Sequence, residues 1–417
     1  MTDGQDLAVD GGPAVRTGPP LPSAMSADGR RIGAEEEAAV LRVLRSGMLS
    51  GVWGPEVPAL AREFAEQVGS GHAVACSSGT AALHLAVAAV DPEPGDEIIV
   101  PPISDIGSVA PVLAQNAVPV FADVDPVTGC LDPDRVAELV SPRTRAIVVV
   151  HLFGKAADVT RLRALADANG VMLIEDCAQA YLTPVSAGSA LAGTAGHLGC
   201  FSLQQHKHVT AGDGGLVVTD DAGLAERMRR FADKGWPRET GERAYLHFAL
   251  NYRMTELVAA VAREQLRKLP DVVTARRRHA ARLTAQLADL PGATLPADAG
   301  DHSYWYYPLL IDGLDEPGLQ RYAAALTSEG VPAVPGYLRR PLYAEPVLRE
   351  PRTYGMSGYP LRGSTEYSDG LCPVAESLVY RRLVVLPCNE NFTDADVDDV
   401  AAAVRKVHTR LATGGAA

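Results

Sequence analysis

Lys207 is the residue whose type and surroundings point most clearly to chemistry. It is one of five lysines among 417 residues, and it stands between Phe201-Ser-Leu-Gln-Gln-His and the glycine-rich turn Gly212-Asp-Gly-Gly215. Apolar residues on both sides predict two strands, so the lysine would lie in a packed setting. Burial or a neighbouring cation lowers the pKa of an amine and makes it a nucleophile toward a carbonyl group. The alternative is a surface lysine whose charge stays in water.

Two further motifs fall where strands are expected to end, which is where open α/β sheets bind ligands. In Cys76-Ser-Ser-Gly-Thr80 the amides of Gly79 and Thr80 begin an amphipathic helix and could bind a phosphate, although the motif is also an ordinary helix cap. Glu175 and Asp176 end a buried strand. Because successive strand side chains point to opposite faces, they cannot form one catalytic pair. One acid could hold a ring nitrogen protonated, or cap a helix.

The remaining polar motifs have structural interpretations. Asn251-Tyr-Arg-Met-Thr-Glu256 opens a long helical segment, where a cap and an ion pair of Arg253 are expected. His206 and His208 flank Lys207, but no cysteine or acid nearby completes a metal-ligand spacing. No metal site is therefore expected.

Composition excludes several classes of function. With 51 acidic and 38 basic side chains the net charge is −13, which does not suit a protein that binds a nucleic-acid backbone. The six cysteines show no disulfide or metal spacing and predict a reduced, cytoplasmic protein. The first ten residues lack the apolar core of a signal peptide, and no apolar run reaches about 18 residues, so no membrane partner is expected.

Helical and strand-like segments alternate over the first two thirds of the chain. This order predicts an α/β fold with a mostly parallel sheet between helices. Strands are expected at 97–100, 118–124, 145–152, 171–175, 198–203 and 216–219. Helices are expected at 34–44, 56–68, 80–90, 107–114, 132–139, 159–169 and 223–233.

The last third of the chain has a different order of elements, which predicts a smaller α+β domain. Two helices at 255–269 and 275–290 lead into it. They are followed by strands at 305–311 and 383–386, helices at 317–329 and 394–411, and an irregular stretch at 336–370. We therefore expect three parts: an extended arm at 1–32, a large domain at 33–270 and a small domain at 271–417.

Four motifs in this order resemble the DegT/DnrJ/StrS family of sugar and cyclitol aminotransferases. They are Ser78-Gly-Thr80, Glu175-Asp-Cys-Ala-Gln179, Phe201-Ser-x4-Lys207 with Gly212-Asp-Gly-Gly215, and Asn251-Tyr-Arg-Met-Thr-Glu256. The likeness extends from the arm to the closing Leu386-Pro-Cys-Asn-Glu-Asn-Phe-Thr393. It implies pyridoxal 5'-phosphate (PLP) as cofactor and fold type I, the aspartate aminotransferase-like fold.

The resemblance implies a role for each matching residue. Lys207 would bind the cofactor covalently and then move a proton between the substrate carbon and the cofactor. Asp176 would pair with the pyridinium nitrogen, and Gln179 would lie near the ring or its phenolic oxygen. Asn251 would reach the cofactor of a neighbouring subunit, which implies a homodimer with shared active sites. The phosphate end would be held by Ser78, Gly79, Thr80 and Ser202.

Asp105 departs from the family pattern. Relatives often carry Phe, Tyr or Trp there, whose ring stacks on the cofactor, and an aspartate cannot stack. By its position Asp105 is still counted among the cofactor-binding residues. Either another group covers the exposed face of the ring, or Asp105 contacts the substrate amine or a hydroxyl; the alternative is that Asp105 caps the helix that follows. Tyr337 and Arg339 lie where relatives contact substrate, and Trp236 follows a predicted helix; these three are further substrate candidates.

The function that the resemblance implies is an aminotransferase. It would move an amino group from glutamate or glutamine to a keto-sugar, perhaps nucleotide-linked, or to a keto-cyclitol, in antibiotic, secondary-metabolite or surface-sugar synthesis. One alternative is a PLP enzyme that eliminates, epimerises or replaces a group on an amino acid. The other is a non-catalytic regulator on the same fold.

Overall fold

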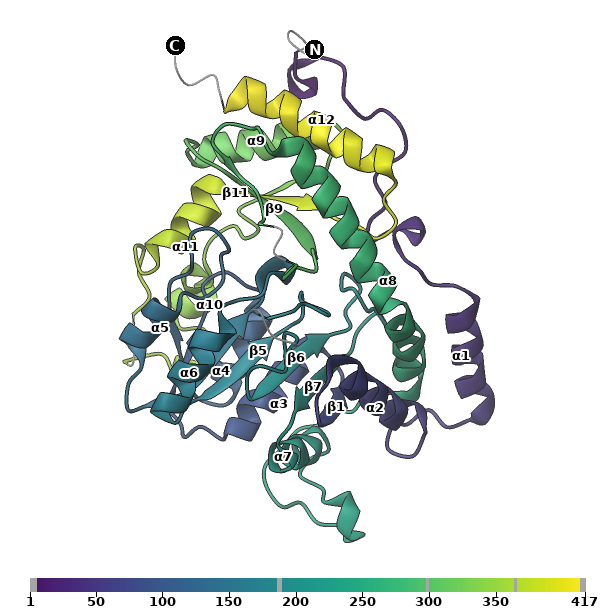
Figure 1. Cartoon of the computed structure of the whole chain (residues 1–417). Coiled ribbons are helices and arrows are strands. Elements are labelled where there is room, and N and C mark those ends of the chain that lie inside the picture. Colours follow the sequence, from purple (N-terminus) through teal and green to yellow (C-terminus); the bar gives the residue numbers. More distant parts are fainter. Residues whose placement is uncertain (1–5, 186–189, 298–299, 364–365, 413–417) are drawn as a thin grey trace.

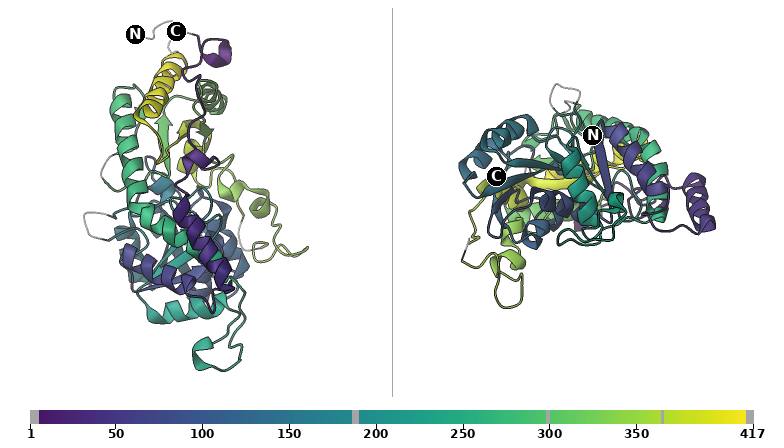
Figure 2. Two further views of the ribbon diagram at one scale, coloured as in Figure 1. Left: turned by 90° about the vertical axis from the view of Figure 1, so that its right-hand side faces the viewer. Right: turned by 90° about the horizontal axis from the view of Figure 1, so that it is seen from below.

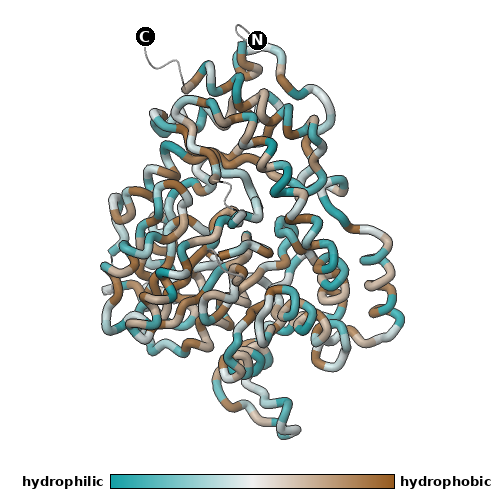
Figure 3. The backbone as a smooth tube through the Cα atoms, viewed as in Figure 1, coloured by the Kyte–Doolittle hydropathy of each residue, from teal (hydrophilic) through white to brown (hydrophobic). Residues whose placement is uncertain are grey.

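Two β-sheets organise the chain, a large one in the lower half of Figure 1 and a small one above it. The computed structural model describes residues 6–185, 190–297, 300–363 and 366–412. Hydrophobic segments follow the interior strands, whereas hydrophobic and hydrophilic residues alternate along the helices that cover them (Figure 3). No helix in these described ranges is long and apolar enough to cross a membrane.

The large sheet has seven strands in the order β1-β7-β6-β5-β4-β2-β3. Strand β7 runs antiparallel to both of its neighbours, and the other pairs are parallel. The predicted mostly parallel sheet is therefore confirmed, including the buried Val- and Ile-rich strands at its centre. The strands are β1 (His72–Cys76), β2 (Glu97–Val100), β3 (Val118–Phe121), β4 (Thr144–Val150), β5 (Met172–Asp176), β6 (Leu198–Ser202) and β7 (Gly215–Thr219).

The helices of the large sheet match the predicted ranges with one exception. The expected helix at 107–114 is divided into a 3-10 turn, η3 (Ile106–Ser108), and a short helix, α4 (Ala110–Ala114). Pro111 explains the division, because proline has no N–H and is tolerated only in the first turn of a helix. The other helices are α1 (Ala34–Ser46), α2 (Glu56–Val68), α3 (Gly79–Val90), α5 (Pro133–Leu139), α6 (Val159–Asn169) and α7 (Ala222–Ala232).

The two helices expected at 255–269 and 275–290 form one long helix, α8 (Glu256–Leu287), so the prediction of a break is wrong. Pro270 lies inside this helix. Leu269 and Val272 on either side of it are buried, so tertiary packing of the apolar face holds the helix together despite the missing hydrogen bond. The domain boundary proposed at residue 270 thus falls within a continuous helix.

The small sheet has four antiparallel strands in the order β10-β11-β9-β8. It has its own hydrophobic core, to which Leu7 and Leu21 of the N-terminal arm contribute. The two-residue strands β8 and β10 were not predicted, because so short a segment shows no hydrophobic periodicity. The elements are β8 (Ala293–Thr294), β9 (Tyr306–Ile311), α9 (Glu316–Ser328), β10 (Val334–Pro335), β11 (Leu383–Pro387) and α12 (Asp394–Leu411).

Two stretches expected to be irregular contain short helices. The arm, expected to be extended, includes η1 (Ala8–Asp10) and η2 (Ala27–Gly29). The stretch before β11 includes η6 (Leu342–Ala344) and α10 (Pro346–Arg349), and it is followed by α11 (Pro373–Ser377) and the π-helical turn η7 (Leu378–Arg382). Further 3-10 turns follow β4, at η4 (Leu152–Gly154), and α7, at η5 (Arg238–Thr240).

Candidate active site

Most of the predicted chemical residues meet in one cavity at the ends of the large-sheet strands. Lys207 follows β6, Asp176 ends β5, and Asp105 follows β2. The cavity has a volume of about 440 Å³, and residues from the small domain close its other side. Its lining includes Ser78, Gly79, Thr80, Asp105, Ser108, Asp176, Ser202, His206, Lys207, Asp213, Trp305, Tyr306 and Tyr337.

The Lys207 amine is held against an aromatic ring. Its Nζ lies 4.0 Å from the centre of the Trp305 ring, within the range of a cation–π contact. The ring is fixed because the Trp305 indole N–H donates to the carbonyl of His206 at 2.7 Å. Burial lowers the pKa of Lys207 to about 8, and the nearby Asp176 and Asp105 oppose this shift. About half of this amine is therefore neutral and nucleophilic near pH 8.

Asp176 is a buried carboxylate whose oxygens already have neutral donors. Ser108 Oγ donates to Oδ2 at 2.7 Å, and the backbone N–H of Ala178 donates to Oδ1 at 3.1 Å. Ser104 lies behind Ser108, with their hydroxyl oxygens 2.7 Å apart. Burial raises the pKa of Asp176, and the hydrogen bond from Ser108 partly offsets this effect. A cation placed against Asp176 would stabilise its ionised form.

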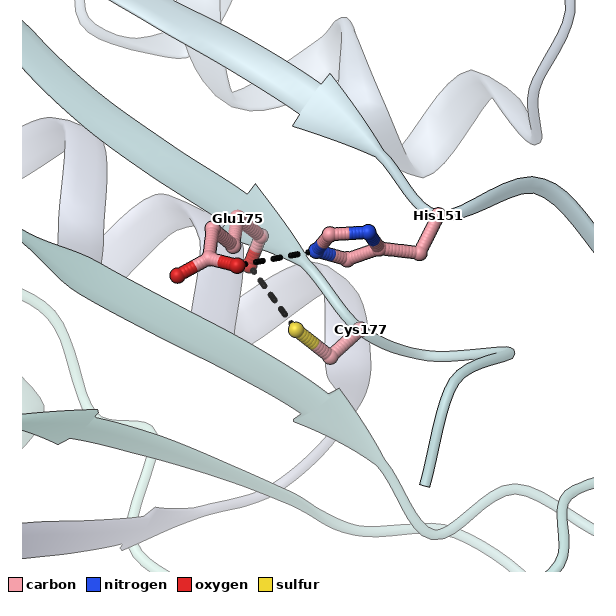
Figure 4. Close-up of side chains that lie close together, drawn as sticks. All are labelled: His151, Glu175 and Cys177. Atoms are coloured by element: carbon pink, nitrogen blue, oxygen red, sulfur yellow. Dashed lines mark hydrogen bonds and ion pairs between the residues drawn. The ribbon is translucent and has the colours of Figure 1, made fainter. Parts of the chain in front are cut away.

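Glu175 points to the other side of β5, as the alternation of strand side chains predicts. It faces His151 at the end of β4 (Figure 4). The His151 Nδ1 accepts from the N–H of Ala157 at 3.1 Å, so the proton lies on Nε2, which donates to Glu175 at 2.9 Å. Glu175 also accepts backbone N–H groups of Gly193, Ala195 and Gly196. This pair anchors the 193–196 segment to the sheet.

Cys177 completes a cluster with His151 and Glu175 whose potential ligand atoms lie within 4.8 Å of one another. Burial keeps the pKa of the Cys177 thiol well above its usual value, so the thiolate that a metal requires is disfavoured. Both ring nitrogens of His151 are occupied by the bonds described above. The three donors are thus committed to the protein, and the expectation of no metal stays a prediction.

The N-terminus of α3 forms a cradle that lines the same cavity. Ser78 caps the helix by accepting the N–H of Ala81 at 3.0 Å, so the structural interpretation of this serine is confirmed. A Cβ on Gly79 would come within 2.6 Å of Ser202 Cβ, so only glycine allows these segments to meet. The first N–H groups of a helix have no acceptor within it and suit a phosphate.

Asp105 has one of the two roles that the sequence left open, the helix cap, and it also lines the cavity. Its Oδ1 accepts the N–H of Gly107 at 2.8 Å and so caps η3. Its carboxylate also lines the cavity, where it acts electrostatically on Lys207 and Tyr337. A Cβ on Gly107 would lie 2.7 Å from Thr80 Oγ1 and 2.9 Å from Asp105 Oδ1, so glycine is required for this arrangement.

Four of the predicted site residues do not line this cavity. Gln179 Oε1 accepts the N–H of Phe153 at 2.6 Å, and its amide donates to Tyr337 Oη at 3.3 Å. Gln179 thus positions Tyr337. Tyr337 lines the cavity and has a backbone φ of 64°. Asn251 and Arg339 are exposed. Trp236 stacks against Arg238, with 3.9 Å between ring centre and Cζ, and lines a separate cavity of about 660 Å³.

A buried ion network behind Lys207 was missed by sequence analysis. Arg30, from the N-terminal arm, donates to the carbonyl of Lys207 at 2.9 Å and to that of Gln205. It faces Glu390, which is bound by Arg276 at 2.6 Å. Burial lowers the pKa of Arg30 to about 10, so it stays protonated near neutral pH. No local pattern marks such a residue, since its partners lie more than a hundred positions away.

The same network reaches the aromatic wall of the cavity. Arg276 Nη1 also donates to the carbonyls of Tyr304, Trp305 and Cys388. The loop that carries Lys207, the start of β9 and the segment after β11 are therefore tied to one pair of guanidinium groups. These contacts hold the backbones of Lys207 and Trp305 in place relative to each other.

The residues present fit PLP at both of its ends. The α3 cradle with Ser202 suits the phosphate, and the buried carboxylate of Asp176 suits a pyridinium nitrogen, whose charge would offset the burial of Asp176. The Lys207 amine lies in the same cavity. Fold and site together define a PLP-dependent aminotransferase of fold type I.

Comparison with known proteins identifies the family. Residues 30–405 match the DegT/DnrJ/EryC1/StrS aminotransferase family, and the chain belongs to it. It is 38% identical to the L-glutamine:2-deoxy-scyllo-inosose aminotransferase of Streptomyces kanamyceticus, over 96% of each chain. The aminotransferase from Psychrobacter cryohalolentis superposes with a TM-score of 0.83 at 29% identity, covering 94% of this chain and all of that one (100%). DesV of S. venezuelae, solved in complex with a ketimine intermediate, gives 0.78 at 31% identity, with 90% and 94% covered.

The lowered pKa of Lys207 predicts how the apoenzyme captures PLP. The neutral amine is the reactive form, so the capture rate should rise with pH and level off above about pH 8, the pKa of the buried amine. An exposed lysine would keep gaining rate up to about pH 10.4. The measurement is the visible absorbance of bound cofactor after rapid mixing at a series of pH values.

Two variants make this prediction specific. Asp105→Asn should move the midpoint to lower pH, because the Asp105 charge raises the pKa of Lys207. Lys207→Ala should leave the fold unchanged but abolish both the visible absorbance and turnover. A normal transamination rate in Lys207→Ala would contradict the assignment.

Removing the Arg30 guanidinium should loosen the lysine loop. Arg30→Ala deletes both hydrogen bonds to the backbone at Lys207 and Gln205, so we expect a loss of about 3 kcal/mol in the free energy of unfolding and weaker PLP binding. Arg42→Ala is the control, because the exposed Arg42 lies 3.6 Å from Glu264 and its loss should cost less than about 0.5 kcal/mol. Urea unfolding measures the free energy of unfolding of both variants. Equal losses in Arg30→Ala and Arg42→Ala would exclude the proposed anchoring.

Proposed function

We propose that this aminotransferase transfers the amino group of glutamine or glutamate to a keto-cyclitol or keto-sugar. The observation that carries the proposal is the buried Lys207 amine, in one cavity with Asp176 and the α3 cradle. The substrate class is supported by the relative from S. kanamyceticus, whose name gives L-glutamine as donor and 2-deoxy-scyllo-inosose as acceptor. We further propose that the product enters antibiotic, other secondary-metabolite or surface-sugar synthesis.

The residues of this chain divide the work between binding and proton transfer. When bound, PLP supplies the electron sink that makes the substrate carbon acidic. Asp176 would keep the ring nitrogen protonated, while Ser108 and Ala178 hold its carboxylate in place. Lys207 would take a proton from the substrate carbon and return it, with Trp305 limiting where the amine can move. Gln179 fixes Tyr337 as part of the substrate wall.

A spectroscopic half-reaction tests the substrate class. The enzyme is converted to its pyridoxamine form and then mixed with a keto-cyclitol, a keto-sugar and simple keto acids in separate experiments. Return of the PLP spectrum with a cyclic ketone is the expected result. Return with keto acids alone would overturn the proposed acceptor. Release of ammonia without any keto acceptor would instead support elimination or replacement on an amino acid.

We also propose that two copies of the chain form a dimer with shared active sites. The segment after α7 extends away from the rest of the chain (Figures 1 and 2). It carries large exposed apolar side chains, with Phe248 84% exposed, and it ends at the exposed Asn251. Trp53, 71% exposed, lies on another loop. Water-exposed apolar groups of this size favour burial against a second copy.

Mixing two variants that are each expected to be defective in cofactor binding tests whether the site is shared. In a mixed dimer of Lys207→Ala and Asn251→Ala, one site would carry both defects and the other would be intact. Random mixing makes half of the dimers heterodimers, so activity should recover to roughly a quarter of wild type. Co-expression followed by an activity assay measures this recovery.

The matched control is a mixture of Lys207→Ala with Asp176→Ala. Both residues belong to the same subunit's cavity, so each mixed site keeps one defect and no recovery is expected. Equal activity in the two mixtures would refute the shared site.

A cytoplasmic location is a further proposal, supported by six cysteines that are all free and buried.

A further inference from the structure

Helix α3 contains a buried histidine that the proposed reaction does not use. His84 lies in the second turn of α3, is 5% exposed and does not line the cavity. Burial lowers the pKa of His84 to about 4, so the ring is neutral near neutral pH. The Gln115 amide nitrogen donates to Nε2 at 2.8 Å, which leaves the ring proton on Nδ1. His84 is thus a hydrogen-bond donor of fixed direction.

The His84 donor binds Tyr252, the neighbour of Asn251 in the chain. Nδ1 donates to Tyr252 Oη at 2.8 Å, across 168 positions of sequence. The centres of the two rings lie 5.6 Å apart, and Phe231 of α7 packs edge-on against the His84 ring with centres 5.3 Å apart. One side chain therefore connects the helix at the cavity to the segment that carries Asn251.

The backbone of Tyr252 is held as well as its hydroxyl group. Its N–H donates to the carbonyl of Ala232, at the end of α7, at 2.9 Å. Tyr252 is thus bound at two points directly beside Asn251. Asn251 is exposed, and its Oδ1 accepts the N–H of Arg253 at 3.3 Å. This bond uses the amide oxygen and leaves the amide nitrogen as a donor, the kind of group that a phosphate oxygen accepts.

We propose that His84 is a positioning residue for the cofactor of the neighbouring subunit, because it holds Tyr252 and thereby directs Asn251 toward the second copy. This inference rests on the proposed function, in which Asn251 completes the site of the other subunit. Helix α3 would then serve both sites of the dimer. Its N-terminus lines the cavity of its own subunit, while His84 holds the segment that reaches the other one.

Tyr252→Phe tests the contact by removing one hydroxyl group. The aromatic ring stays, but Nδ1 of His84 loses its acceptor. We expect the dissociation constant of the full-length apoenzyme for PLP to rise about two- to tenfold, the range for one neutral hydrogen bond. Titration with PLP, followed by the visible absorbance of the bound cofactor, measures it. An unchanged dissociation constant would overturn the proposal.

Tyr322→Phe is the matched control. Tyr322 is also a buried tyrosine, and its Oη lies 3.3 Å from Nδ1 of the buried His408, but both residues lie outside the cavity, on α9 and α12 of the small domain. Urea unfolding should show similar losses of stability in the two variants, whereas PLP affinity should fall only in Tyr252→Phe. Equal weakening of PLP binding in both would mean a general loss of stability, and the proposal would be wrong.

Heterodimers show which of the two sites the contact serves. A different affinity tag on each chain allows a dimer of one Lys207→Ala chain and one Tyr252→Phe chain to be isolated. Its single lysine-containing cavity belongs to the Tyr252→Phe chain, and the Asn251 that serves this cavity comes from the chain with an intact Tyr252. Wild-type PLP affinity is therefore expected. Affinity as weak as in the Tyr252→Phe homodimer would place the effect within one subunit and overturn the proposal.

A second heterodimer separates this proposal from the shared site itself. In a dimer of Lys207→Ala with Asn251→Ala, the cavity that keeps its lysine receives an intact Asn251, so wild-type PLP affinity is expected if the sites are shared. Affinity as weak as in the Asn251→Ala homodimer would refute the shared site, and the role of His84 with it. Normal affinity here, with weak affinity in the Tyr252→Phe heterodimer, would refute only the role of His84.

Discussion

The rest of the site depends on one physical constraint, the burial of a lysine amine. Water stabilises an exposed ammonium group. Loss of this hydration on burial lowers the pKa of Lys207 to about 8. The cost is limited by the Trp305 ring and by the charges of Asp176 and Asp105. A nucleophile is thus produced from an ordinary side chain by the place in which the fold holds it. The same dry setting strengthens every electrostatic contact that a ligand makes there.

The fold holds this amine with segments that are far apart in the chain. Parallel strands bring Lys207, Asp176 and Asp105 to the same edge of the large sheet. The small domain supplies the opposite wall through Trp305 and Tyr337. Arg30, Arg276 and Glu390 then join the arm, the lysine loop and the small domain in one buried network. These connections make the cavity a property of the whole chain.

Alternation along β5 separates two acids of the same type into different roles. Asp176 faces the cavity, where it is available to a ring nitrogen, whereas Glu175 faces His151 and the backbone of the 193–196 segment. Glu175 therefore anchors the structure that supports Asp176. Asp105 combines two positions in one side chain, because one oxygen caps η3 while the carboxylate lines the cavity.

The sequence by itself determined the features that arise from local order. Strand and helix periods predicted most of the large domain. The order of its motifs carried the family resemblance, which implied the roles of Lys207, Asp176 and the α3 N-terminus. Period-two alternation also separated Glu175 from Asp176. Tertiary structure decided what depends on distant contacts. Packing carries α8 through Pro270, and folding alone brings Ser108, Trp305 and Arg30 to the site. Their roles depend on contacts between residues that are far apart in the chain. The residues next to them in sequence do not indicate such contacts.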